Sequence, residues 1–167
     1  MEKSSGQALN PQIITRSGIS ASLAIKPKKQ LGQHWLKQKS VLNKILSAAD
    51  LKKGDLIIEI GPGLGILTEE LAKKAGKIIA IEKDLALIPI LKKNLQGLKN
   101  IEISSGDALR INFDGVKNYK VVANLPYYAA TAIIRKFLES KIKPKLMVLM
   151  LQKEVGQRIC ARPGEMN

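Results

Sequence analysis

A short apolar run followed by a glycine-rich turn and then by a helical pattern constrains the fold of this chain most strongly. The run from Leu56 to Ile60 is rich in β-branched residues, which is typical of a strand buried on both faces. It ends in the turn Gly61-Pro62-Gly63-Leu64-Gly65. Apolar residues then recur on one helical face at Leu67, Leu71 and Ala75. This order predicts a strand, a glycine turn and a helix, the opening unit of a parallel sheet.

Further apolar runs repeat this alternation. The expected strands are Lys77 to Ile81 with Glu82 at its end, Ile101 to Ser104, Tyr119 to Ala123 and Leu146 to Leu151. Helices are expected between them, one from about Ala129 to Glu139 and one that begins at Asp84, with a kink or irregular start caused by Pro89. Strands separated by helices form a parallel sheet with helices on both faces. The expected fold class is therefore α/β, Rossmann-like.

Two helix ends are predicted from single residues. Before the first strand, apolar residues from Val41 to Ala49 recur at helical spacing, and Ser40 is placed to cap that helix. Gly76 stands where the helix after the glycine turn is expected to end in the left-handed conformation.

The charge of the chain indicates a polyanionic partner. Lys and Arg number 28 against 14 Asp and Glu, a formal net charge of +14. RNA or DNA is the leading candidate, because cations gain affinity for phosphates by releasing counterions; an anionic membrane and a merely solvated surface remain open. Lys26 to Lys29 can track phosphates or be a solvated linker. We expect five further cations near the face that receives the target: Arg135, Lys136, Lys141, Lys143 and Lys145.

Other classes of protein are disfavoured by composition. The one cysteine, Cys160, cannot form an internal disulfide, and with one histidine, His34, no metal-ligand cluster is expected, so a reducing cytoplasm fits. No apolar run approaches the roughly 20 residues that cross a bilayer. Residues 1–26 are expected to be a disordered extension; being acid-poor and Ser-rich, they leave an organelle transit peptide open.

The ends of four expected strands carry polar or glycine-rich groups: the turn after Ile60, Glu82, Asp107 and Asn124. Ligands of open parallel sheets bind outside these carboxyl ends. Glycines allow a ligand to approach the backbone closely, and Glu82 is placed to accept hydrogen bonds from ribose hydroxyls. An adenosine-containing cofactor is predicted. The dinucleotide fingerprint would have its third glycine at Ile66, so a nicotinamide-dependent oxidoreductase is disfavoured.

Two motifs suggest methyl transfer. Glu59 begins E-x-G-x-G-x-G, which resembles motif I of class I methyltransferases, whose loop wraps the methionine part of S-adenosylmethionine. Asn124-Leu125-Pro126-Tyr127 resembles the motif of enzymes that methylate exocyclic amino groups of bases. The Asn124 side chain and the Leu125 backbone carbonyl can accept hydrogen bonds from the two N–H groups of the amine. Pro126 stiffens the turn, and Tyr127 offers a face on which the base can stack. Three other aromatic residues can each be a second stacking surface or a core residue: Tyr128, Trp35 and Phe137. A core position is favoured for Phe137.

Six segments resemble the KsgA-type ribosomal RNA adenine dimethyltransferases: Lys29 to Leu36, Glu59 to Thr68, Ile81-Glu82, Gly106 to Ala108, Asn124 to Tyr127 and Leu151 to Val155. The resemblance implies dimethylation of N6 of two adjacent adenosines in the 3′-terminal hairpin of small-subunit ribosomal RNA, by a cytoplasmic monomer during ribosome biogenesis. It also implies that S-adenosylmethionine is bound by His34, Leu36, Gly61, Gly63, Glu82, Asp107 and Asn124, with Asp107 meeting the adenine amino group. The family often has Asn at the position of His34, whose contact is expected through its backbone.

The resemblance also implies more chain than these 167 residues. Family members continue into two more strands and a small helical domain. We therefore expect residues 27–167 to be an incomplete methyltransferase domain with about five of seven strands, poorly stable or inactive alone. The rival readings are a DNA or large-subunit ribosomal RNA adenine methyltransferase and a non-catalytic RNA-binding assembly factor.

Overall fold

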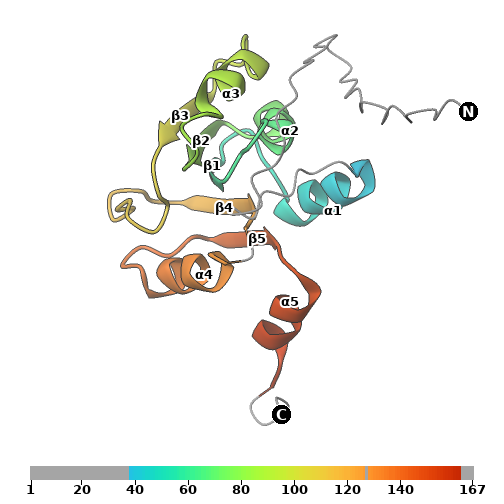
Figure 1. Ribbon diagram of the computed structural model, residues 1–167, viewed down its shortest axis with the longest axis vertical. Coiled ribbons are helices and arrows are strands. Elements are labelled where there is room, and N and C mark those ends of the chain that lie inside the picture. Colours follow the sequence, from blue (N-terminus) through green and yellow to red (C-terminus); the bar gives the residue numbers. More distant parts are fainter. Residues whose placement is uncertain (1–37, 127, 163–167) are drawn as a thin grey trace, which may run out of the picture.

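The computed structural model describes residues 38–126 and 128–162, and within them five parallel strands form one sheet in the order β3-β2-β1-β4-β5 (Figure 1). The strands are β1 (Leu56–Ile60), β2 (Lys77–Glu82), β3 (Ile101–Ser105), β4 (Tyr119–Asn124) and β5 (Leu146–Met150). Each expected strand is present, and the α/β fold class is confirmed.

Helices cover both faces of this sheet. They are α1 (Lys39–Ala49), α2 (Ile66–Lys74), α3 (Ile88–Asn94), α4 (Ala130–Glu139) and α5 (Lys153–Cys160). Successive strand residues point to opposite faces. Ile57 accordingly packs in the cluster with α1 and α2, whereas Ile58 packs in the cluster with Phe137 of α4. Both isoleucines are fully buried, so the prediction of a strand covered on two sides is confirmed.

Three predicted helix ends have different outcomes. Ser40 is not a cap, because α1 begins at Lys39 and Gln38 precedes it without a side-chain cap. Gly76 is not left-handed; it is required because a Cβ there would collide with the Lys53 carbonyl oxygen. The helix expected to begin at Asp84 does not begin there, because α3 begins only at Ile88 and Leu87 precedes it. The irregular start at Pro89 is confirmed: Pro89 occupies the first turn, where a missing N–H costs little.

The end of the described chain packs loosely. In the described part, β5 has β4 as its neighbour, and all five of its residues are partly exposed. α5 has no buried residue and extends away from the sheet (Figure 1). None of the helices within residues 38–126 and 128–162 has the length and apolarity needed to span a membrane.

Candidate functional site

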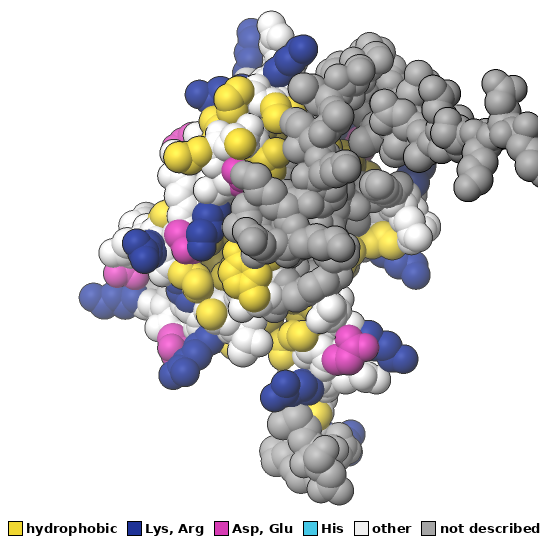
Figure 2. All heavy atoms as spheres, in the orientation of Figure 1, with side chains coloured by type: hydrophobic (Ala, Val, Ile, Leu, Met, Phe, Trp, Pro, Cys, Tyr) yellow, Lys and Arg dark blue, Asp and Glu magenta, His cyan; other side chains and the backbone are white. Residues whose placement is uncertain are grey.

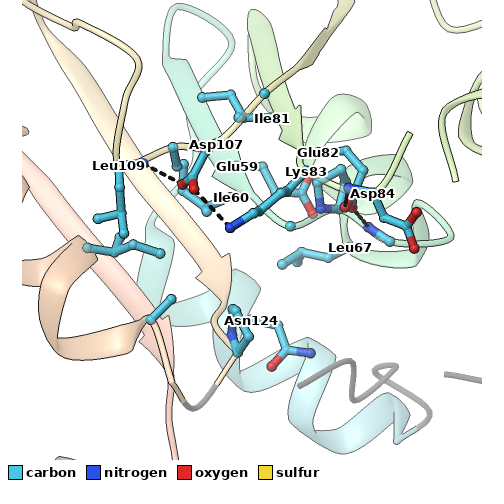
Figure 3. Close-up of a pocket in the computed structure, with 18 of the residues that line it drawn as sticks. Glu59, Ile60, Leu67, Ile81, Glu82, Lys83, Asp84, Asp107, Leu109 and Asn124 are labelled. Atoms are coloured by element: carbon cyan, nitrogen blue, oxygen red, sulfur yellow. Dashed lines mark hydrogen bonds and ion pairs between the residues drawn. The ribbon is translucent and has the colours of Figure 1, made fainter. Parts of the chain in front are cut away.

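The carboxyl ends of β1, β2, β3 and β4 line one pocket (Figure 3). Its walls include most of the predicted site residues that the structure describes: Gly61, Gly63, Glu82, Asp107, Asn124 and Pro126. Leu125 is not a lining residue; its side chain is buried in the core behind the pocket. The predictions for His34, Leu36 and Tyr127 fall outside the described residues. The same holds for Trp35 and for residues 1–26.

The glycine turn after β1 requires a backbone that only glycine adopts readily. Gly61, Gly63 and Gly65 have φ of 70°, 60° and 87°. The Gly61 N–H donates to the Ile81 carbonyl at 2.9 Å. A Cβ on Gly65 would lie 2.9 Å from Leu91 Cδ1, so the third glycine also lets α3 pack closely. The turn therefore presents bare backbone to the pocket.

Glu82 connects two of the loops that surround the pocket. Its Oε2 accepts the Gly63 N–H at 3.0 Å, and its Oε1 accepts the Asp84 N–H at 2.8 Å. The residue is only 5% exposed. A carboxylate oxygen can accept a second hydrogen bond, so Glu82 can hold the turn and still accept from a ligand hydroxyl.

Asp107 faces Lys83 across one end of the pocket (Figure 3). Its Oδ2 lies 2.9 Å from Lys83 Nζ, and its Oδ1 accepts the Leu109 N–H at 3.0 Å. The hydrogen bond from Lys83, and then that from Leu109, lower the pKa of Asp107 below its usual value. Sequence reasoning missed Lys83, because a lysine after a strand is no signal by itself and its partner is distant in sequence.

Glu59 is a buried acid in the wall of the pocket. It is 1% exposed, and among the described residues its Oε2 has no hydrogen-bond partner. Burial raises the pKa of Glu59 to about 8; the Thr68 hydroxyl opposes this rise, and the nearby charge of Glu82 adds to it. The Thr68 hydroxyl is close but makes no well-formed hydrogen bond. The sequence marked Glu59 only as the first residue of its motif.

The turn after β4 places a polar side chain and an aromatic ring at the pocket. Asn124 is the last residue of β4 and lines the pocket. The turn is fixed by hydrogen bonds from Leu125 N–H to the Met150 carbonyl at 3.3 Å and from Ala129 N–H to the Pro126 carbonyl at 3.1 Å. Tyr128 is 57% exposed and also lines the pocket. Phe137 is a core residue, as favoured, with 1% exposure.

The prediction that five cations lie near the target face is wrong for Lys141, Lys143 and Lys145. Lys145 N–H donates to the carbonyl of Tyr119, the first residue of β4, so this loop lies at the edge opposite the pocket. Lys141 and Lys143 belong to the same loop. A helix that connects parallel strands returns the chain to their amino ends, which explains the placement. Lys136 Nζ donates to the Leu109 carbonyl at 2.8 Å and supports the loop after Asp107 instead.

The chain is similar to known proteins over most of its length. The family model described as "Ribosomal RNA adenine dimethylase" matches residues 24–167. "Ribosomal RNA small subunit methyltransferase A" of Dehalococcoides mccartyi is 50% identical over 146 residues, which cover 85% of this chain and 50% of that protein. The chain therefore spans about half the length of the curated relatives that it matches.

Two solved structures are similar in both fold and sequence. A dimethyladenosine transferase from Plasmodium falciparum is 37% identical with a TM-score of 0.70, covering 77% of this chain and 47% of that one. The 23S rRNA methyltransferase ErmE is 28% identical with a TM-score of 0.69, covering 74% of this chain and 50% of that one.

Proposed function

Because the chain belongs to the ribosomal RNA adenine dimethylase family, we propose that it methylates adenine N6 in small-subunit ribosomal RNA with S-adenosylmethionine as the donor. The observation that supports this best is the pocket itself, in which the glycine turn, Glu82, Asp107 and Asn124 meet. The fuller proposal is dimethylation of two adjacent adenosines in the 3′-terminal hairpin, on the precursor of the small subunit, by a cytoplasmic monomer.

The residues present fit this cofactor. Glu82, whose oxygens already accept two backbone N–H groups, would accept the ribose hydroxyls. Asp107 would accept a hydrogen bond from the adenine amino group. The backbone at Gly61 and Gly63, which carries no side chain, leaves room for the methionine part. When bound, S-adenosylmethionine supplies a methyl group on a positively charged sulfur. His34 and Leu36 complete the proposed set.

The turn after β4 would orient the accepting amine. An adenine amino group is a poor nucleophile because its lone pair is delocalised into the ring. Asn124 and the Leu125 carbonyl would accept hydrogen bonds from its two N–H groups and so favour tetrahedral geometry at nitrogen. Tyr127 would stack on the base. Pro126 fixes the turn, so the reacting atoms are held in line and orientation lowers most of the barrier. Tyr128, exposed at the pocket, offers a second stacking face.

Methyl transfer by the product of the gene that encodes this sequence tests this proposal. Labelled S-adenosylmethionine would be incubated with small subunits that lack the modification, and with large subunits as a second arm, before nucleoside mass analysis. We expect dimethyladenosine in small-subunit RNA, and a loss of roughly a hundredfold or more in Asn124→Ala. Asn43→Ala, an exposed position on α1, is the matched control.

The other outcomes separate the rival functions. Methylation of the large subunit alone would support the large-subunit enzymes. With DNA as a third arm, methylation of DNA alone would support a DNA methyltransferase. Saturable RNA binding by a folded chain that binds no S-adenosylmethionine would support a non-catalytic assembly factor.

A further inference from the structure

Glu59 is a buried acid that the proposed reaction does not use. It is the second-last residue of β1 and lines the pocket, yet it is 1% exposed and its Oε2 has no partner among the described residues. An unpaired carboxylate is costly to bury, so a group in such a place is held neutral unless a positive charge arrives.

The surroundings of Glu59 offer it no cation in the structure described. On α2, Thr68 contributes an uncharged hydroxyl, and Glu69 is directed to Lys73 at the surface. On β2, Glu82 is a second acid, which disfavours a charge on Glu59. The buried residues of α1 are apolar, namely Ile45, Leu46 and Ala49.

The cations and acids beyond these elements already have partners. Lys83, after β2, pairs with Asp107 from the loop after β3, and Asp84 accepts the Ala86 N–H. At the end of β4, the polar residue facing the pocket is the uncharged Asn124. Within residues 38–126 and 128–162, no cation is left to pair with Glu59, so a positively charged ligand is the partner that the pocket can offer it.

We propose that Glu59 is protonated in the empty pocket and releases its proton to solvent when the positively charged cofactor binds. This inference rests on the proposed function. S-adenosylmethionine has a sulfonium, an ammonium and one carboxylate, and so one net positive charge, whereas the demethylated product is neutral overall. The cofactor's charge favours the carboxylate form of Glu59, and its loss favours reprotonation. Glu59 thus acts as a positioning residue that distinguishes donor from product by charge.

Calorimetric titration of the 167-residue chain in buffers of different ionisation enthalpy measures the released protons. At pH 7 we expect wild type to release more protons per cofactor than Glu59→Gln, by up to about one. The cofactor affinity of wild type should rise by up to about tenfold per pH unit between pH 6 and 7, relative to Glu59→Gln. Glu102→Gln, on the exposed start of β3, should behave as wild type.

Three results would overturn the inference. They are equal proton release by wild type and Glu59→Gln, unchanged pH dependence in that variant, and equal Glu59-dependent release with donor and product. Should Glu59→Gln not fold, Thr68→Val replaces it: removal of the hydroxyl should move the pH dependence upward, and no movement would contradict the inference. Failure of the proposed function is a different result, the absence of saturable cofactor binding by a folded chain.

Discussion

At the scale of single residues, polar groups that line the pocket already have partners within the protein. Both oxygens of Asp107 have partners, Lys83 and the Leu109 N–H. A cofactor amino group that reaches Asp107 therefore has to share an oxygen with Lys83 or displace it. The ion pair is half exposed on the lysine side, where solvent makes such pairs weak, so displacement is cheap.

Lys83→Met is expected to tighten cofactor binding. The change frees Asp107 Oδ2 and removes a positive charge near a positively charged ligand, and we expect a gain of no more than about fivefold. Added salt should strengthen binding to wild type slightly by loosening the pair, and should not do so in the variant. Equilibrium titration at two salt concentrations measures both effects. Weaker binding by Lys83→Met would instead show that the lysine contacts the cofactor.

Glu59 also predicts how the stability of the empty chain depends on pH. The unfolded chain loses this proton near pH 4.5 and the folded chain near pH 8, because burial raises the pKa of Glu59. Between these values the folded form binds more protons, so the free energy of unfolding falls as pH rises and levels off above about 8. Glu59→Gln should lose this component. Urea unfolding of both proteins at pH 5 and 8 tests it; a constant difference between them would refute it.

At the scale of elements, a lysine on the sheet holds the end of α1. Lys120 Nζ donates to the carbonyls of Ala49 and Asp50 at 3.1 and 2.7 Å and to Asp55 Oδ2 at 2.8 Å. Burial alone would raise the pKa of Asp55, but the hydrogen bonds from Lys120 and from the Lys52 N–H lower it. The stabilisation is therefore present at neutral pH and lost as pH falls through the lowered pKa.

Lys120→Met is expected to lower the free energy of unfolding by about 1–3 kcal/mol, because it leaves the partly buried Ala49 carbonyl without its lysine donor and Asp55 without its cation. It should also weaken the acid dependence that comes from Asp55, whose remaining donor is the Lys52 N–H. Lys77→Met is the matched control, since Lys77 also lies on a strand but pairs with Glu102 at the exposed surface, where little change is expected. Equal losses in the two variants in urea unfolding would contradict this account.

Gly76 and Gly54 allow a second matched comparison between elements. Gly76→Ala should cost about 1–3 kcal/mol, because the new Cβ collides with the Lys53 backbone carbonyl and the loop before β1 has to move. Gly54→Ala, with nothing within 4 Å of a Cβ, should be close to neutral. Thermal unfolding of both variants measures the difference; a harmless Gly76→Ala would show that the loop adapts.

The elements were predictable from the sequence to different degrees. The strands could be predicted, because apolar runs such as Leu56–Ile60 end at glycine or acidic residues. The need for glycine at position 76 could not be predicted, because it arises from the backbone carbonyl of Lys53, in a loop distant in sequence. The site residues at strand ends followed from the parallel sheet, but the Lys83–Asp107 pair depends on side-chain geometry across two loops. The edge occupied by Lys141 to Lys145 could have been derived from the direction of α4.

At the scale of the whole molecule, the Lys and Arg side chains of the described residues are spread around the face that Figure 2 shows. Proximity to the pocket should therefore decide which cations bind RNA. Arg110 follows Asp107 after β3, and Lys153 follows the carboxyl end of β5, so both belong to the pocket edge. Both are exposed, as are Lys141 and Lys143 at the opposite edge.

Two double variants with equal charge change test this assignment. Replacing Arg110 and Lys153 with Gln should weaken binding to small-subunit RNA and lower the slope of log affinity against log salt by about two. Replacing Lys141 and Lys143 with Gln should leave the slope nearly unchanged. Filter binding at several salt concentrations provides the comparison. Equal slopes in the two variants would show that cations at the pocket edge do not contribute more to RNA binding than cations at the opposite edge.

The double role of Glu82 limits how this site can change during evolution. The same carboxylate that would accept ligand hydroxyls also holds the Gly63 and Asp84 backbones. A mutation that altered ligand preference at this position would also release both loops, so the two properties cannot be selected separately. New ligand preferences are more accessible at Asp107, whose partners are one exposed lysine and its own turn. Divergence among descendants of this chain should therefore begin at the end of the pocket where Asp107 lies.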